Sequence, residues 1–239
     1  MKHIVAGIIA VFATTAVAEP LSLVTEDYPP YAYRENGKLI GSSVEQVELM
    51  MKAIGQDHTM EMMPWARALA LAEKQPRHCV FTTTHNAERD PHFKWVEPLL
   101  WGRTLLVRKS GTAVNPVTLD QARDLTVGAT RDDFTADLLK AKNFRKIDLA
   151  TDFNLNLKKL MLGRIDMMPI AEDYYNKLRR EGTEIDRVLI LSEQIFSLAC
   201  NKSVADDEIA RMQSALDKLI ADGTQARLFR KYGLEIESH

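Results

Sequence analysis

Segments with strand patterns and segments with helix patterns alternate along this chain of 239 residues. Runs rich in β-branched and apolar residues predict strands over 21–25, 59–63, 79–84, 104–108, 125–129, 165–170, 188–191 and 196–200. Apolar residues at helical spacing predict helices over 44–54, 65–73, 134–139, 153–162, 172–180 and 206–222. Such alternation is typical of an α/β fold. Two similar α/β segments, near 19–103 and 104–195, indicate two lobes, and the C-terminal helices must pack on one of them.

The first eighteen residues have the pattern of a secretory signal peptide. A basic start precedes the apolar run Ile4–Val11, which is too short to cross a bilayer, and small residues end the segment at Ala18. We expect cleavage after Ala18 and an exported, soluble product of 221 residues. The alternative is a retained membrane anchor.

The charge balance argues against a nucleic-acid partner. The chain has 31 basic and 33 acidic side chains, and loss of Lys2 with the signal brings the formal net charge from −2 to −3. Binding to a phosphate backbone requires a basic face. No low-complexity tract or short repeat is present, so we expect the mature chain to be folded nearly end to end.

The chain has two cysteines, Cys79 and Cys200. In an oxidising compartment an isolated pair of cysteines is a candidate disulfide. The alternative is two buried thiols, which are common in hydrophobic cores. The pair lacks the spacing of a zinc site, and the sequence predicts no metal site.

The loop after the first predicted strand contains two consecutive prolines, Pro29 and Pro30. Two prolines are not compatible with a central strand, so we expect a rigid loop that presents Tyr28 and Tyr31. A helix follows, and Ser42 or Ser43 is the expected N-cap, with Gly55 at the helix end. This part of the chain therefore places two aromatic side chains near the end of the first strand.

A short polar stretch from Cys79 to Arg89 has the composition of a carboxylate receptor. Thr82 and Thr84 are expected to point the same way, because strand side chains alternate. Arg89 follows the strand and can hold a carboxylate with two parallel hydrogen bonds. The alternative is that the threonines simply suit a strand and that Arg89 is a solvated surface charge.

The order of motifs resembles that of the bacterial periplasmic solute-binding proteins of ABC transporters, in the polar amino acid (family 3) group. The resemblance covers the mature chain and rests on motifs at 26–31, 36–41, 84–93, 119–128, 163–166 and 229–233. It implies a type II periplasmic-binding fold, in which two α/β lobes are joined by two hinge strands. The expected boundaries are 19–103 with 196–239 for lobe I and 104–195 for lobe II.

The resemblance also implies which residues bind a solute between the lobes. Arg89 matches the family's arginine for the ligand α-carboxylate, with Thr84 and Thr82 as hydroxyl donors. Tyr28 matches an aromatic residue that covers the ligand. The second-lobe loop supplies Thr130, Asp133 and Phe134. The acid of the first loop is either Glu26 or Asp27. The family's acid for the ligand amino group falls on Ala171, with Glu172 beside it, which puts a free α-amino acid in doubt.

These expectations define a binding protein that closes its lobes on a small carboxylate-bearing solute, an amino acid or a related organic acid. The hinges are expected near 101–104 and 195–198. The expected partner is an ABC permease in the inner membrane, the expected location is the periplasm, and a monomer without cofactor is expected. One alternative is a periplasmic enzyme, such as a cyclic-acid dehydratase, whose acid or base would be Glu172, Glu26, Asp27 or His85. A second alternative is a binding protein that serves a signalling partner.

Overall fold

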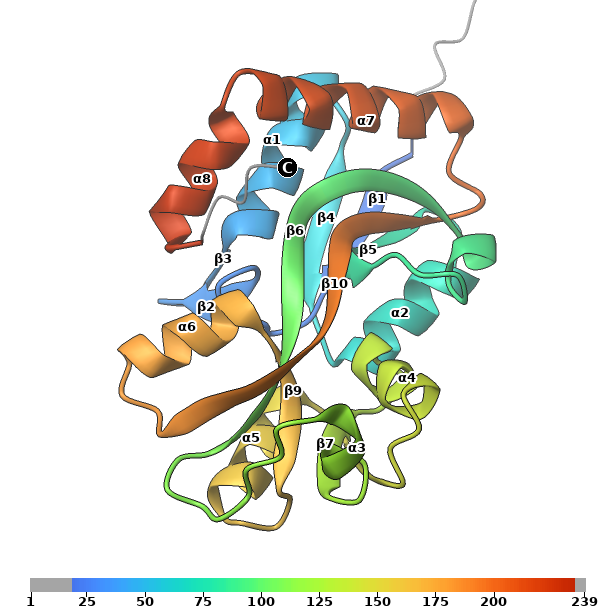
Figure 1. The fold of residues 1–239 in the computed structure, drawn as a ribbon. Helices are drawn as coiled ribbons and strands as arrows, with labels where there is room; N and C mark the ends of the chain where they lie inside the picture. Colours follow the sequence, from blue (N-terminus) through green and yellow to red (C-terminus); the bar gives the residue numbers. More distant parts are fainter. Residues whose placement is uncertain (1–18, 235–239) are drawn as a thin grey trace, which may run out of the picture.

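The computed structural model describes residues 19–234, and the predicted signal peptide lies outside this range. The chain folds as a mixed α/β protein with one large sheet in the order β4-β1-β5-β10-β6-β9-β7-β8 (Figure 1). The strands are β1 Leu21–Thr25, β2 Tyr33–Glu35, β3 Lys38–Ile40, β4 His58–Met62, β5 His78–Thr84, β6 Phe93–Lys109, β7 Thr126–Thr130, β8 Lys146–Ala150, β9 Met167–Ala171 and β10 Ile185–Asn201.

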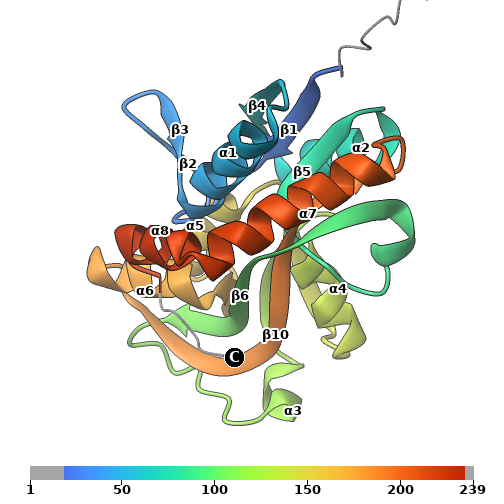
Figure 2. The same ribbon diagram turned by 90° about the horizontal axis from the view of Figure 1, so that it is seen from above.

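Helices cover both halves of this sheet. They are α1 Ser42–Ile54, α2 Trp65–Lys74, α3 Leu119–Ala122, α4 Phe134–Ala141, α5 Phe153–Met161, α6 Glu172–Arg180, α7 Asp206–Ala221 and α8 Thr224–Tyr232, with a 3₁₀ turn at Asp90–His92. Within the described residues, no helix is long and apolar enough to span a membrane. The predicted helices are all present, and the C-terminal pair packs on the half that contains β1, as Figure 2 shows for α7.

Two strands of 17 residues each, β6 and β10, run through both halves of the molecule (Figure 1). They pair antiparallel along their length. On one side, β10 pairs with β5 from Phe196 to Cys200, and parallel pairing of β5, β1 and β4 completes lobe I. On the other side, β6 pairs with β9 from Thr104 to Arg108, and β7 and β8 complete lobe II. The fold is therefore two α/β lobes joined by two crossing strands.

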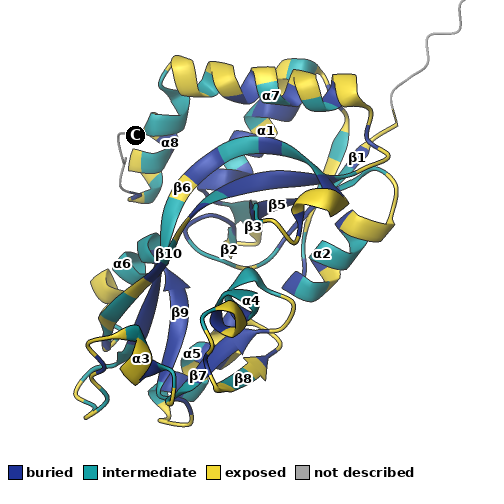
Figure 3. Cartoon of the chain, turned by 45° about the vertical axis from the view of Figure 1, so that its right-hand side comes forward, coloured by how far each residue is buried: buried dark blue, intermediate teal, exposed yellow. Residues whose placement is uncertain are grey.

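Each lobe has its own hydrophobic core. In lobe I, side chains of β1, β5 and α1 meet those of α7, including the fully buried Leu23, Met50, Phe81 and Met212. In lobe II, one cluster lies under α5 and α6 and another under α4, on the two faces of the buried strand β9 (Figure 3). Each lobe is thus a compact unit, with its strand ends directed towards the other.

The predicted disulfide is confirmed, since Cys79 and Cys200 are bonded and both are fully buried. The two residues lie opposite each other in the β5–β10 ladder. The bond therefore joins the strand that ends at the predicted site to the strand that returns from lobe II.

The predicted serine cap of α1 is wrong. The N-cap is Gly41, with φ of 137°, and it makes no side-chain cap. The N–H groups of Ser42 and Ser43 instead donate to the carbonyls of Pro30 and Tyr31, at 3.1 Å each. A Cβ at position 41 would lie 2.1 Å from the Tyr31 oxygen, so the close approach requires glycine. This contact fixes the proline loop, and with it the two tyrosines, on the first helix.

Candidate ligand-binding site

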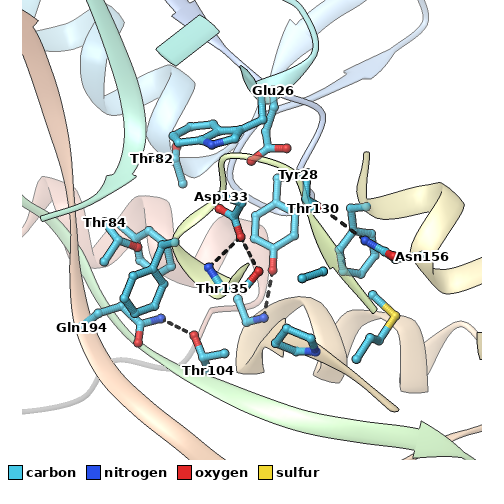
Figure 4. A pocket seen from close by; sticks show the side chains of 18 of the residues that line it. Glu26, Tyr28, Thr82, Thr84, Thr104, Thr130, Asp133, Thr135, Asn156 and Gln194 are labelled. Atoms are coloured by element: carbon cyan, nitrogen blue, oxygen red, sulfur yellow. Dashed lines mark hydrogen bonds between the residues drawn. The ribbon is translucent and has the colours of Figure 1, made fainter. Parts of the chain in front are cut away.

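A cavity lies between the two lobes, at the carboxyl ends of β1, β5, β7 and β9 (Figure 4). Its empty space is about 620 Å³, a figure that includes the part open to solvent. Ligands of open α/β sheets bind outside the carboxyl ends of strands, because loops and helix starts converge there. The lining residues are Glu26, Tyr28, Trp65, Thr82, Thr84, Arg89, Thr104, Gly128, Ala129, Thr130, Asp133, Phe134, Thr135, Phe153, Asn156, Met168, Pro169, Ala171, Gln194 and Phe196.

Arg89 is the buried cation of this cavity, with 6% of its surface exposed. Its guanidinium donates to the carbonyls of Thr84, at 3.4 Å, and Asp132, at 3.3 Å. It lies 5.2 Å from the centre of the Trp65 ring. No carboxylate among residues 19–234 forms an ion pair with it. Burial lowers the pKa of Arg89, and the charges of Asp133, Asp137, Glu88 and Glu26 counteract this. A buried guanidinium without a paired carboxylate favours an anionic ligand.

Thr82 and Thr84 both line the cavity, but the expected strand alternation is broken at Thr82. Thr82 lies at the irregularity between β5 and β10 and has φ of 62°. This conformation is strained for a β-branched residue. The Thr82 hydroxyl is buried and has no hydrogen-bond partner in the structure. The strained backbone therefore directs an unpaired hydroxyl to the cavity wall.

Lobe II contributes the start of α4 and the end of β7, as predicted for the loop from Thr130 to Phe134. Asp133 is the N-cap of α4, and its carboxylate accepts hydrogen bonds from the N–H and hydroxyl of Thr135, at 3.0 and 2.5 Å (Figure 4). Asn156 donates to the Thr130 hydroxyl at 3.4 Å, and its own side-chain oxygen is buried without a partner. A Cβ at Gly128 would lie 2.8 Å from that oxygen, so glycine leaves room for it.

Glu26 is the acid of the first loop that reaches the cavity, because it follows β1 directly. Its carboxylate has no hydrogen bond or ion pair among residues 19–234. Enclosure between the lobes raises the pKa of Glu26 well above its usual value. The charges of Asp133 and Asp27 raise it further, and Arg89 acts in the opposite direction. The cavity thus combines one buried cation with two carboxylates, Glu26 and Asp133.

Hydrogen bonds join the lobes around the cavity. The carbonyl of Asp132, whose φ is 57°, accepts from the Trp65 indole at 2.8 Å and from Arg89. The hydroxyl of Tyr28 accepts from the N–H of Ala171 at 2.9 Å, and the Tyr31 hydroxyl donates to Asp173 at 3.0 Å. Since the donors and acceptors come from opposite lobes, these contacts hold the lobes in a closed arrangement.

Tyr28 packs in lobe II as well as bonding to it. Its ring meets Phe153 and Tyr174 edge to face, with centroids 5.4 and 5.2 Å apart. Such pairs stabilise by about 0.5–1.5 kcal/mol beyond burial. Tyr28 therefore both lines the cavity and joins the lobes, and its hydroxyl accepts from the N–H of Ala171.

Replacing Tyr28 by phenylalanine should weaken solute binding roughly 5-fold or more, because the closed form would then leave the buried N–H of Ala171 unsatisfied, at about 1–3 kcal/mol. The ring packing would remain. Titration calorimetry with a bound solute measures the change. Tyr174→Phe is the matched control, since it makes the same change on a neighbouring ring whose hydroxyl has no hydrogen bond among the described residues. Equal affinities of the two variants would contradict a closing role for the Tyr28 hydroxyl.

Some predicted residues do not reach the cavity. The Asp27 side chain is exposed; partial burial of its carboxyl raises its pKa, and a hydrogen bond with Asn154 acts in the opposite direction. Glu172 begins α6 and pairs with Arg103 at 2.6 Å and Arg187 at 3.1 Å, on the strands β6 and β10. His85 pairs with two carboxylates outside the cavity. The structure therefore does not bring these three side chains into the candidate site, and of the groups considered for acid–base chemistry only Glu26 lines it.

Two α/β lobes on crossing strands, with a polar cavity between them, define the class of two-lobed solute-binding proteins. The chain belongs to the bacterial extracellular solute-binding proteins, family 3, because the model of this family matches residues 22–235. Among curated proteins it is similar to "Probable amino-acid-binding protein YxeM" of Bacillus subtilis (strain 168), with 25% identity over 213 residues, 85% of this chain and 79% of the relative.

Solved structures of binding proteins share the fold. The arginine-, lysine-, histidine-binding protein ArtJ of Geobacillus stearothermophilus superimposes with a TM-score of 0.82 at 17% identity, covering 92% of this chain and 97% of ArtJ. A histidine kinase sensor domain with similarity to periplasmic binding proteins gives a TM-score of 0.82 at 19% identity, covering 91% of this chain and 98% of the domain. The family and the two binding-protein relatives, YxeM and ArtJ, are described as binding proteins. The described residues contain no cluster of His, Cys, Asp or Glu suited to a metal ion.

Proposed function

We propose that this protein captures a small carboxylate-bearing solute, an amino acid or a related organic acid, between its lobes and presents it to an ABC permease. The observation that carries the proposal is Arg89, a buried guanidinium on the cavity wall without a carboxylate partner among residues 19–234. Thr82 and Thr84 lie beside it and can donate to the same carboxylate. YxeM is named a probable amino-acid-binding protein and ArtJ an arginine-, lysine-, histidine-binding protein, which supports this class of ligand.

We further propose that a positive group of the solute lies between Glu26 and Asp133. These carboxylates line the cavity, whereas the end of β9 has Ala171, whose N–H already bonds to Tyr28. A cation between them would offset the charge repulsion and the desolvation that raise the pKa of Glu26. The ammonium of an amino acid, or a basic side chain, has the required charge.

Glu26→Gln should make the protein without added solute more stable at neutral pH. An acid whose pKa is raised on folding disfavours the folded state when ionised, so wild-type stability should fall as pH rises above the usual value of 4.5. Glu26→Gln lacks this pH-dependent loss of stability. The difference in stability between the variant and wild type should therefore vanish near pH 4. Thermal unfolding between pH 4 and 8 measures it.

Glu88→Gln is the control for this change, because Glu88 is exposed on the loop beside Arg89. It removes one carboxylate near the same arginine without entering the cavity. A solute with a positive group should also bind more weakly to Glu26→Gln than to Glu88→Gln. Unchanged stability and affinity in Glu26→Gln would contradict the assigned position of the positive group.

The lobe boundaries belong to this proposal. Residues 101–103 of β6 pair with 193–195 of β10, while β9 pairing begins at Thr104 and β5 pairing at Phe196. At these residues β6 and β10 pair with no third strand among the described ones, so rotation there disrupts few ladder hydrogen bonds. This supports hinges near 101–104 and 195–198, and lobes at 19–103 with 196–239 and at 104–195. A hinge of this kind closes the lobes over bound solute.

A thermal-shift screen tests the ligand class. The mature protein, expected to be a periplasmic monomer after signal cleavage at Ala18, is screened against amino acids, small organic acids and their carboxamides. A true ligand raises the unfolding temperature, by an amount that grows with the logarithm of its concentration relative to Kd. We expect at least one carboxylate to stabilise the protein and its carboxamide to fail. Stabilisation by the carboxamide equal to that by the acid would contradict the proposal.

The same fold occurs in a histidine kinase sensor domain, so the fold is compatible with service to a signalling partner. The two roles differ in what deletion of the gene does. Uptake of the labelled solute should fall in the deletion strain if the protein feeds a permease. Normal uptake with a lost transcriptional response to the solute would favour signalling instead.

A further inference from the structure

His85 lies outside the cavity, between the end of β5 and the loop that carries Arg89. Its Nδ1 is 2.9 Å from a carboxylate oxygen of Glu97, and its Nε2 is 2.8 Å from a carboxylate oxygen of Asp90. The ring stacks on Trp95, with centroids 4.0 Å apart and planes 9° apart. A quarter of the side chain remains exposed. The imidazole is thus held by three neighbours from two different elements.

The two carboxylates determine the protonation state that fits this geometry. A neutral imidazole has one donor and one acceptor nitrogen, so one of its nitrogens would face a carboxylate with a lone pair. The imidazolium donates to both. Burial acts to lower the pKa of His85, but the hydrogen bonds and charges of Asp90 and Glu97 outweigh it and raise the pKa.

Glu97, on one side of the His85 ring, is fixed to the crossing strands. The oxygen of Glu97 that accepts from His85 also accepts from the Ser197 hydroxyl of β10, at 2.7 Å. The backbone N–H and carbonyl of Glu97 both bond to the side chain of Gln213 on α7, at 2.9 and 2.7 Å. Asp217 accepts from the same amide at 2.8 Å. The N–H of His85 itself donates to the carbonyl of Ile195, at 3.3 Å.

On its other side, the His85 ring contacts Asp90 in the loop that carries Arg89. Asp90 follows Arg89 directly, and its N–H donates to the carbonyl of Asn86 at 2.9 Å. The N–H of Arg89 donates to the side chain of Asn86, also at 2.9 Å. Asp90 is otherwise well exposed, at 63% of its side chain. The His85 ring is therefore the side-chain link between the loop that presents Arg89 and the strands on which the lobes turn.

We propose that His85 is a positioning residue, whose imidazolium fixes the Arg89 loop to the crossing strands, so that solute affinity falls when His85 loses its proton. This inference rests on the proposed ligand role of Arg89. The groups that face the ring are Asp90, Glu97 and Trp95, with Ser197, Gln213 and Asp217 behind Glu97. The only cation of this set is His85. The link is complete below the pKa of the folded protein and is lost as pH rises through it.

The test compares pH profiles of affinity for the tightest-binding solute of the screen, between pH 5.5 and 8.5. We expect wild-type affinity to fall about 5- to 10-fold over this range, because a charge-assisted hydrogen bond is lost. His85→Gln should have the weaker affinity throughout and a flat profile. Asp90→Asn, a change at an exposed carboxylate, should move the wild-type midpoint to lower pH. His58→Gln is the matched control, since His58, on the edge strand β4, pairs with Glu48 of α1 far from the cavity lining, and the change should leave the profile unchanged.

A second measurement needs no solute. Hydrogen exchange of the amides of Arg89 and Asp90, corrected for the intrinsic pH effect, should accelerate in wild type as His85 titrates and should already be fast in His85→Gln. The inference would be overturned if His85→Gln showed the same pH profiles of affinity and of hydrogen exchange as wild type. Absence of any solute binding at every pH would instead overturn the proposed function. In that case, pH-dependent exchange would still establish that His85 fixes the Arg89 loop.

Discussion

Arg89→Ala is expected to weaken solute binding about 30-fold to several thousand-fold. Truncating one partner of a buried, hydrogen-bonded charge pair costs about 2–5 kcal/mol, much of it because the other charge is left unpaired. The solute carboxylate would face the carbonyl of Thr84 and the Trp65 ring without a cation, since Arg89 is the cation that lines the cavity among the described residues. Titration calorimetry of the mature protein measures the loss.

Two further variants sharpen this test. Arg89→Lys keeps the charge but loses the planar fork, so it should recover only part of the affinity. Arg131→Ala removes an exposed arginine of the second-lobe loop that does not line the cavity, and should change binding by less than about twofold, because exposed charges are screened. Undiminished binding by Arg89→Ala would refute the anchor. Equal losses in Arg89→Ala and Arg131→Ala would show a general effect of charge instead.

The stability of Arg89→Ala is a second property that can be measured. Burial of this guanidinium lowers its pKa, so the protein without added solute bears a desolvation cost at this position. We therefore expect the alanine variant to retain its fold and to unfold cooperatively. A variant that binds weakly but unfolds like wild type separates a lost contact from a lost structure.

Much of the fold could be predicted from periodicity, because most strands and helices have one buried face. The strand β8, Lys146–Ala150, was not predicted. It is an edge strand whose ladder partner among the described strands is β7, and two of its five residues, Lys146 and Asp148, are charged, so it lacks a strong apolar pattern. The predicted strands at 188–191 and 196–200 are one strand, β10, since pairing with β6 continues across the polar residues between them.

Prolines inside strands illustrate how tertiary pairing decides what sequence leaves open. Pro98 lies within β6, where the β6–β10 register shifts between Phe196 and Leu198, so no regular ladder bond is lost there. Pro169 lies in β9, whose pairing with β7 is limited to Met167. Its missing N–H is therefore not needed on that side, which faces the cavity. Both positions fit the rule that proline is tolerated where a ladder is interrupted.

The site residues that follow the ends of strands could be predicted from the sequence. Glu26, Arg89 and Asp133 follow β1, β5 and β7 closely, and each reaches the cavity. Trp65 and Asn156 lie on helices, α2 and α5, whose sequences fit an ordinary core. Only the packing of the two lobes brings them to the cavity, and a single sequence holds no signal for that approach.

Glu172 is predicted as a site residue by counting positions along a motif, and such counting does not show which way a side chain points. It follows Ala171 at the start of α6, where a carboxylate is favourable to the helix. At this point the backbone turns from strand to helix, so neighbouring side chains diverge. Ala171 faces the cavity, while Glu172 turns to Arg103 and Arg187. One residue of displacement thus separates a cavity position from an ion-pair network on the crossing strands.

Removing the disulfide by Cys79→Ala with Cys200→Ala should lower the free energy of unfolding by about 4–5 kcal/mol. The bond closes a long loop, with 121 residues between its ends in sequence, and so restricts the unfolded chain strongly. Domains are stable by only about 5–15 kcal/mol, so the variant would keep little reserve. Both sulfurs lie in the core of lobe I, and their loss removes packing as well. Urea unfolding of the variant against wild type measures the difference.

Solute binding should respond far less than stability to this change. Cys79 and Cys200 face each other in the β5–β10 ladder, whose backbone pairing continues to Thr84 and holds the site without the covalent bond. We therefore expect affinity within about threefold of wild type well below the unfolding temperature, since the contacts at the cavity are unchanged. Wild type unfolded with and without reductant is the control, because it removes the bond without changing any residue. A stability loss below about 1 kcal/mol would contradict the loop argument, and a large loss of affinity in the folded variant would show that the bond itself positions the strand that leads to Arg89.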